Sequence, residues 1–355
     1  MISQLIGTGL VRGVLNSFLR PRDVLSLARS SRCMFMECTR NALALSGRRR
    51  IICVENCELT AAAGRAACEI GAWEVLTCAN LVVSGEEIML AVTEHFRNLL
   101  ELPTLRRLSV TLIAKDYFFW LLNLTLIVND FKNSTGKNKL EELSIDFGSN
   151  SCSNAPAPAP VLFDFFESLR CCDKLKVLKL DSIPVSSGVS LKLPVNLHEL
   201  FLYRWFSVGL VKEDLTGLTR LCISGCSLNC EQAALLFDRR TWSKLVCLEL
   251  PDNLLSSTRF LFGASLPCLR KIDFCNNNLS EDFDSVLELL RRSPNLQYLG
   301  IGSNMIGETG LISLLSFCEK TTRNRPLVIN ASRNGIRIAA QVKATSIHHL
   351  KILFE

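Results

Sequence analysis

The sequence predicts an α/β solenoid, with parallel strands on the concave face, helices mostly on the convex face and a small helical cap at the N-terminus. Two observations favour this fold class. A leucine-based pattern recurs along most of the chain, and the stretches between its copies space their apolar residues as amphipathic helices do. A length of 355 residues also exceeds one ordinary single-core domain, and a repeat architecture accounts for that length.

The repeated pattern is L-x-x-L-x-L-x-x-N/C-x-L, which reads as a strand that ends in a turn. Its ninth position takes Asn or Cys, because a side chain there must satisfy backbone groups inside the stack. Near-complete copies span 218–228, 245–255, 269–279 and 296–306, and weaker ones span 51–59, 80–88, 105–113, 140–148, 175–183, 197–205 and 329–336. The residues expected at the fourth position are Ile52, Leu81, Leu108, Leu143, Leu178, Leu200, Leu221, Leu248, Ile272, Leu299 and Ile329.

Helices are expected between the strands, most clearly at 231–240 and 281–294, where apolar residues recur at i, i+3, i+4 and i+7. One strand and one helix cannot close a core alone, so neighbouring units must stack. Insertions lengthen the array near 114–138 and 149–162. The second contains alternating Ala and Pro, which predicts an extended surface segment that joins neither a helix nor a sheet interior.

These copies resemble the leucine-rich repeat, and the segment SNMIGETGL at 303–311 resembles its ribonuclease-inhibitor subclass. The resemblance implies a horseshoe-shaped solenoid of about 11 repeats over 48–355. Short steps from Leu178 to Leu200 and from Leu200 to Leu221 depart from the pattern, because they leave no room for a full helix. We therefore expect the curvature to change there.

The first residues, 1–47, lack the repeat and are expected to be helical. The stretch 10–40 resembles an F-box, in which an apolar helix, a proline and a leucine-rich helix follow one another. The resemblance implies docking on a Skp-type adaptor of a cullin ubiquitin ligase. Its contact residues here would be Leu10, Val14, Leu15, Phe18, Leu19, Pro21 and Val24. The other interpretation is that these helices only cap the first repeat, which every solenoid requires.

A partner protein is expected on the concave face, because positions five and seven of each copy alternate with the buried positions and point outward. The segment FLYRWF at 201–206 combines Tyr, Trp and Arg, the residue types that dominate interface energetics. An alternative is that its aromatic side chains fill the space of a missing helix. The predicted partner-binding residues are Phe201, Tyr203, Arg204, Trp205, Glu249, Arg270, Asp273 and Tyr298.

Catalysis, a metal and a cofactor are not expected. The 16 cysteines contain no Cys-x-x-Cys pair, and the four histidines lie near no recognisable nucleophile. A net charge of +6 without one long basic stripe argues against nucleic acid, and no apolar run is long enough to cross a membrane. We expect an intracellular and reducing setting, the cytoplasm first, with the mitochondrion (from the basic N-terminus) or the nucleus as alternatives.

The function predicted from these patterns is a protein-binding scaffold that serves as the substrate receptor of an SCF-type ubiquitin ligase. An inhibitor, or a structural subunit of a larger assembly that is mitochondrial, is the alternative. In that alternative the N-terminal helices act only as a cap.

Overall fold

The computed structural model describes residues 96–97, 99–102, 105–113, 117–148, 159–183, 193–204, 214–321, 325–336 and 350–354, with the strand backbones at 51–54 and 78–84. The chain divides into two compact units, Met1–Leu140 and Glu141–Glu355, called unit 1 and unit 2 below. The N-terminal residues expected to form an F-box or a cap lie outside the described residues.

The described part of unit 1 contains three parallel strands in chain order, β1 (Ile51–Val54), β2 (Cys78–Ser84) and β3 (Arg107–Ile113). Their register corrects one expectation, because Ala79, and not Leu81, pairs with both Ile52 and Leu108. A shift of two residues keeps the same side chains on the same face of a strand, so the leucine pattern alone cannot detect it. The expected insertion near 114–138 is largely a helix, α7 (Tyr117–Asn133), followed by the 3-10 turn η2 (Gly136–Lys139).

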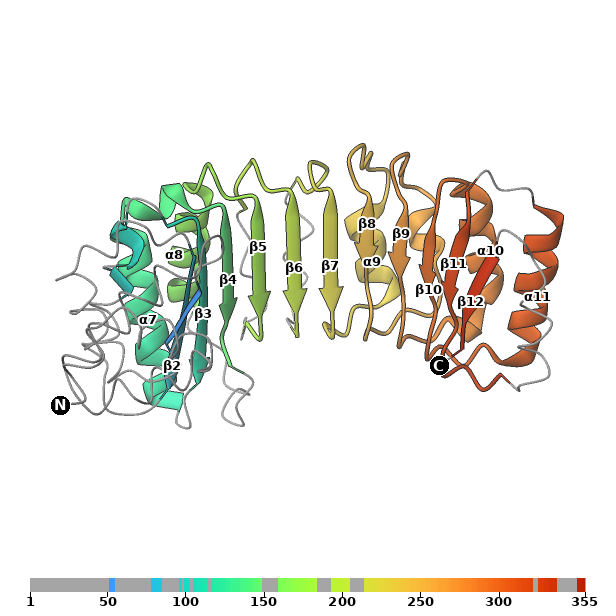
Figure 1. Ribbon diagram of the computed structural model, residues 1–355, viewed down its shortest axis with the longest axis horizontal. Coiled ribbons are helices and arrows are strands. Elements are labelled where there is room, and N and C mark those ends of the chain that lie inside the picture. Colours follow the sequence, from blue (N-terminus) through green and yellow to red (C-terminus); the bar gives the residue numbers. More distant parts are fainter. Residues whose placement is uncertain are drawn as a thin grey trace, which may run out of the picture. The chain divides into compact units, whose positions relative to one another are not determined.

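Unit 2 is a single run of parallel strands in which each strand pairs with the next one along the chain (Figure 1). The eight expected fourth-position residues from Leu143 to Ile329 all fall in register. The strands are β4 (Glu142–Asp146), β5 (Val177–Asp181), β6 (Glu199–Tyr203), β7 (Arg220–Ser224), β8 (Cys247–Glu249), β9 (Lys271–Asp273), β10 (Tyr298–Gly300), β11 (Leu327–Asn330) and β12 (Leu350–Leu353). This strand order and the recurring leucines make the fold a leucine-rich-repeat solenoid.

The helices of unit 2 lie behind the strands in the view of Figure 1, except the last, which lies beside them at the right-hand end. They are α8 (Ala159–Arg170), α9 (Cys230–Phe237), α10 (Phe283–Arg292) and α11 (Gly307–Lys320), with the 3-10 turns η4 (Arg259–Leu261) and η5 (Leu279–Asp282). The helices expected at 231–240 and 281–294 are therefore confirmed as α9 and α10. No helix of the described residues is long and apolar enough to span a bilayer.

Helix α8 corrects the expectation for the Ala-Pro segment. Ala159 and Pro160 belong to the helix, as its first two residues, instead of continuing an extended excursion. Proline is tolerated in the first turn of a helix, because the N–H that it lacks would have no intrahelical partner there. The preceding residues 151–158 lie outside the described part of the chain.

Asparagine side chains in the turns after β8, β9, β10 and β11 join consecutive repeats of unit 2. The side chain of Asn304 is fully buried, and its Nδ2 donates to the carbonyl oxygens of Phe274 and Gly302 at 2.9 and 3.0 Å. Its Oδ1 accepts the backbone N–H of Leu279 at 3.1 Å. Asn253, Asn277 and Asn334 repeat this arrangement in their own turns. Each asparagine thus satisfies backbone groups of two neighbouring repeats at once.

Cys226 occupies the same position in the repeat of β7, where the ladder of asparagines begins. Its Sγ lies 3.3 Å from the Ser224 carbonyl oxygen and 3.7 Å from that of Leu202. Asn253 of the next repeat donates to Ile223 and accepts from Cys226, so it satisfies groups of the cysteine-containing repeat. The thiol therefore fills the slot as a weak donor.

Aromatic side chains fill the core where a helix is absent. Between β8 and β9 the chain forms only η4, and Phe260 of this turn packs against Phe237 of α9 at 5.8 Å and Phe274 at 6.3 Å between ring centroids. Phe237 in turn packs 5.1 Å from the ring of Trp242. All four rings are buried, so the short repeat keeps a filled interior.

Candidate functional site

The side of the unit 2 sheet that faces away from the helices is called the open face below. Alternation along the strands is regular in β4 and β5, where leucine and isoleucine are buried and the residues between them are half-buried. Figure 1 looks onto this face, with α8, α9 and α10 behind the strands. The strand residues on it are Glu142, Ser144, Asp146, Val177, Lys179, Asp181, Glu199, Phe201, Tyr203, Arg220, Cys222, Ser224, Cys247, Glu249, Lys271, Asp273, Tyr298, Gly300, Val328, Asn330, Lys351 and Leu353.

Cations enclose an aromatic ring at the centre of the open face. Lys179 on β5 and Arg220 on β7 lie over the ring of Phe201 on β6, with Nζ and Cζ 5.5 and 4.8 Å from its centroid. Such contacts stabilise a cation where water is partly excluded. Lys179 also forms an ion pair with Glu142 at 2.7 Å. Phe201 is only 6% exposed as a result, so the exposure expected from its strand position is not found.

Glu249 on β8 is a shared acceptor for two cations. Its Oε2 accepts from Arg220 Nη2 at 2.8 Å, and its Oε1 accepts from Lys271 Nζ on β9 at 2.6 Å. Lys271 Nζ lies 5.2 Å from the ring centroid of Tyr298 on β10. The contacts therefore connect strands β4 to β10 through one series of side chains, called the charged row below: Glu142, Lys179, Phe201, Arg220, Glu249, Lys271 and Tyr298.

The pKa of Glu249 is set by opposing effects. Burial alone would raise the pKa, but the hydrogen bonds and charges of Lys271 and Arg220 outweigh burial and lower it below its usual value of 4.5. Because the unfolded chain then binds a proton more readily than the folded one, this carboxylate stabilises the fold above about pH 4.5. That contribution is lost as the pH falls through the lowered pKa.

We expect Glu249→Gln to lower the free energy of unfolding at pH 7 by about 1 kcal/mol, a modest value because Arg220 and Lys271 remain partly in water. Urea unfolding followed at pH 7, 5 and 3.5 should show the difference between variant and wild type shrinking at the lowest pH. Glu319→Gln, at an exposed position of α11, is the control and should match wild type at each pH. A difference that stays constant down to pH 3.5 would contradict the assignment.

Next to the charged row lies an aromatic pair. The rings of Phe201 and Tyr203 stack at 6.3 Å with an interplanar angle of 19°. Burial and the neighbouring Cys222 raise the pKa of Tyr203 to about 12, so its hydroxyl stays protonated and can donate a hydrogen bond. Arg204 follows in a left-handed conformation, with φ of 51°, and binds both oxygens of Asp181 at 2.7 and 2.8 Å.

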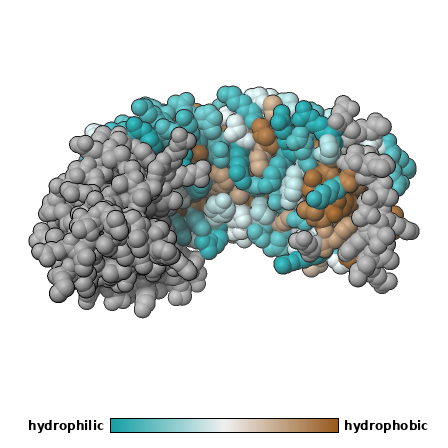
Figure 2. All heavy atoms as spheres, in the orientation of Figure 1, coloured by the Kyte–Doolittle hydropathy of each residue, from teal (hydrophilic) through white to brown (hydrophobic). Residues whose placement is uncertain are grey.

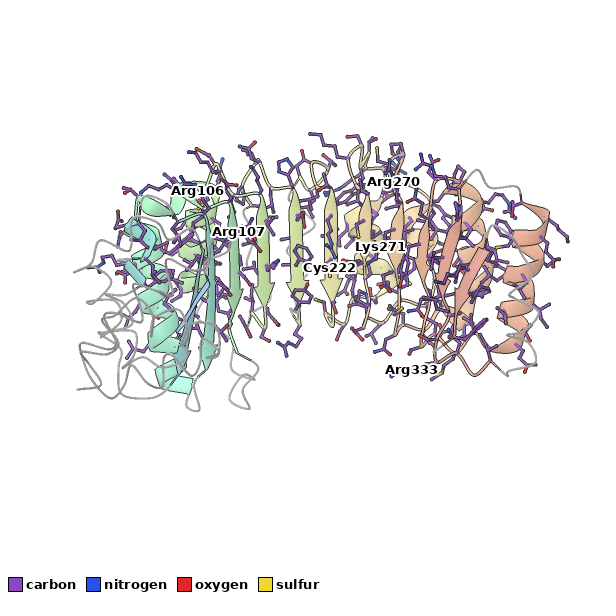
Figure 3. The ribbon with its side chains drawn as sticks, viewed as in Figure 1. Arg106, Arg107, Cys222, Arg270, Lys271 and Arg333 are labelled. Carbon is purple, nitrogen blue, oxygen red and sulfur yellow. The ribbon has the colours of Figure 1, made fainter. Side chains whose placement is uncertain are left out.

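The structure brings most of the predicted partner-binding residues together. Phe201, Tyr203, Glu249, Asp273 and Tyr298 all lie on the open face, and Arg204 lies directly after it. Arg270 instead lies at the N-terminal end of β9, directly before the first residue of that strand (Figure 3). Trp205 and the proposed adaptor-binding residues lie outside the described residues.

The partner-binding residues predicted from the sequence did not include the cations Arg220 and Lys271. Both occupy the third position of their repeats, which points to the same face as the fifth position because strand side chains alternate. Including position three in the outward set would have found them.

Free thiols line the open face, but they are not activated. Burial raises the pKa of Cys222 and of Cys275 to about 12, and that of Cys247 to about 11. A thiolate is the reactive form, so buried Cys222 and half-buried Cys247 and Cys275 remain unreactive thiols. Among the residues that the structure describes, no three His, Cys, Asp or Glu side chains are placed to hold a metal ion.

No protein-family model matches the chain, and no curated protein matches its sequence. Among solved structures, a protein from Bacteroides fragilis is similar at 15% identity, with a TM-score of 0.46, over 82% of this chain and 83% of that one. A chain of the TLR13–ssRNA13 complex is similar at 15% identity, with a TM-score of 0.38, over 80% of this chain and 51% of that one. The fold assignment therefore depends on the strand order and the asparagine ladder of the chain itself.

Proposed function

We propose that this chain is a non-catalytic scaffold that binds a partner protein on the open face of unit 2. The observation that carries the proposal is the charged row with its neighbour Tyr203. Tyrosine and arginine are the residue types most enriched where binding energy concentrates. Here Tyr203 and Tyr298 are half-buried and held by neighbours, so little side-chain entropy would be lost when a partner covers them.

Substitution of Tyr203 and Tyr298 tests this proposal. We expect the double variant Tyr203→Ala/Tyr298→Ala to weaken partner binding by at least about 30-fold, as loss of central interface tyrosines does. Full-length chain serves as bait, and co-purifying proteins are quantified by mass spectrometry against wild type. Ile312→Ala, at a 62% exposed position of α11, is the matched control. Partners retained by the double variant and lost by Ile312→Ala would place the binding surface on the helices.

We further propose that the scaffold is the substrate receptor of an SCF-type ubiquitin ligase, and that its repeats are of the ribonuclease-inhibitor type. The F-box-like order of residues in 10–40 supports the first point. Helices α9, α10 and α11 between successive strands support the second. The open face would then select the substrate, while Leu10, Val14, Leu15, Phe18, Leu19, Pro21 and Val24 would contact the adaptor.

Adaptor binding is tested separately from substrate binding. We expect purified Skp-type adaptor to bind the full chain, and Leu15→Asp/Phe18→Asp to abolish that binding, because charge placed in an apolar contact stays desolvated and unpaired. Asn16→Asp adds charge beside these positions and is the control. Undetectable binding of adaptor to the intact chain would leave the N-terminal segment as a cap only.

A further inference from the structure

The cations on the open face over β4–β9 are each paired with a carboxylate of the same face. Lys179 pairs with Glu142, and Arg220 and Lys271 share Glu249. Arg204, directly beyond β6, is bound on both oxygens of Asp181. In this part of the described surface, every strand cation therefore has a carboxylate within 4 Å.

Carboxylates on the same strands are in excess. Asp146 on β4, Glu199 on β6 and Asp273 on β9 take part in none of the ion pairs found among the described residues. Asp146 and Asp273 each accept one backbone N–H, from Gly148 and Cys275, which leaves further acceptor sites on each group. The strands β4–β9 place six carboxylates on the open face against three cations, with Arg204 as a fourth directly after β6, so this part of the face is locally negative although the whole chain carries +6.

These three carboxylates lie too far apart for one positive charge to neutralise all of them. Strands lie about 4.8 Å apart and residues rise about 3.3 Å along a strand, so Glu199 lies roughly 16 Å from Asp146 and roughly 16 Å from Asp273. Charges interact over only about 8 Å at physiological ionic strength. A single amine cannot satisfy them, and several separate cations are required.

The other end of the open face, over β10–β12, lacks this negative charge among its described residues. The described open-face residues of β10–β12 are Tyr298, Gly300, Val328, Asn330, Lys351 and Leu353, with no carboxylate among them. Figure 2 shows hydrophobic residues gathering at this end, where Leu353 is 36% exposed. Positive charge on a partner is therefore favoured over β4–β9 and not over β10–β12.

We infer that the partner on the open face is a basic protein segment whose several lysines or arginines lie over β4–β9. The inference rests on the proposed function and names its partner class. Charge complementarity carries it, because opposite charges across an interface increase the association rate and exclude wrong partners. Nucleic acid is disfavoured by the same excess of carboxylates, since its phosphates would face them without counter-charges.

Oligomers of known charge test the inference on the full-length chain. Fluorescent decalysine, decaglutamate and decauridylate are titrated by anisotropy at low ionic strength. The test variant is Asp146→Asn/Glu199→Gln/Asp273→Asn, in which the amide oxygens can still accept the backbone N–H groups. The control Glu231→Gln/Asp284→Asn/Glu319→Gln removes the same charge from exposed positions of α9, α10 and α11.

We expect decalysine to bind wild type and the control variant alike, and the test variant about tenfold more weakly, since charge contacts with three half-buried carboxylates are lost. Equal decalysine affinity in both variants, or no binding to wild type, would overturn the inference. Preferential binding of decaglutamate or decauridylate to the open face would also overturn it. The proposed function would survive each of these outcomes, because the Tyr203→Ala/Tyr298→Ala comparison tests it without reference to partner charge.

Discussion

Asn304→Ala should lower the free energy of unfolding of unit 2 by about 3–5 kcal/mol. The substitution removes three hydrogen bonds and leaves the N–H of Leu279 buried without a partner, which costs about 1–3 kcal/mol. The carbonyls of Phe274 and Gly302 each keep one donor, Asn277 Nδ2 and the N–H of Asn276, so each of those two lost hydrogen bonds costs only about 0.5–1.5 kcal/mol. Urea unfolding at pH 7, followed by circular dichroism, measures the loss. A change below about 1 kcal/mol would show that the asparagine ladder does not hold the repeats together.

Two further variants separate hydrogen bonding from packing at this position. Asn304→Asp keeps an acceptor but loses both donors, so it should be destabilised nearly as much as the alanine variant. Asn304→Cys should fall between wild type and alanine, because Cys226 fills the equivalent slot three repeats earlier. Asn278→Ala, an exposed asparagine in the preceding repeat, should stay within about 0.5 kcal/mol of wild type.

Phe237→Ala should cost about 3–5 kcal/mol, the usual loss for a fully buried phenylalanine. Its ring contacts both Trp242 and Phe260, so the cavity would open between α9 and the repeat that lacks a helix. The same urea transition measures it, and Trp242 fluorescence should change as well because the indole loses its neighbour. Leu235→Ala, 53% exposed on the same helix, is the control and should have little effect.

A small effect of Phe237→Ala on the free energy of unfolding would contradict the claim that the Phe237 ring is needed to fill this core. It would mean that η4 collapses onto α9 without Phe237, so that Phe260 alone fills the short repeat. Phe237→Leu distinguishes the two cases. It should recover part of the stability if volume is what the site requires.

Much of the fold followed from the leucine pattern. In unit 2 the pattern predicted the pairing partner of each fourth-position leucine or isoleucine, because leucine or isoleucine also recurs at positions one and six of most copies, with or without the turn asparagine. In unit 1 the weak copy around Leu81 has neither residue at those two positions, and the register differed by two residues. The start of α8 at Ala159 was not predicted, because alternating Ala and Pro favours an extended chain. Proline is, however, also tolerated in the first turn of a helix.

The site was predicted less completely than the fold. The strand positions of Phe201, Tyr203, Glu249 and Tyr298 followed from alternation alone. Their burial did not, because it depends on which long side chains of the neighbouring strands lie across them, as Arg220 does over Phe201. Contacts of this kind join residues far apart in the sequence and depend on the register of two strands at once.

Photo-crosslinking from the two sides of the sheet tests whether the partner binds the open face or the helices. A benzoylphenylalanine replaces Tyr203 on the open face or Ile312 on α11, in full-length chain expressed in its own cells, and crosslinked proteins are identified after irradiation. If the partner binds the open face, we expect a specific adduct from position 203 that is absent from position 312. Adducts from position 312 with none from position 203 would contradict binding at the open face.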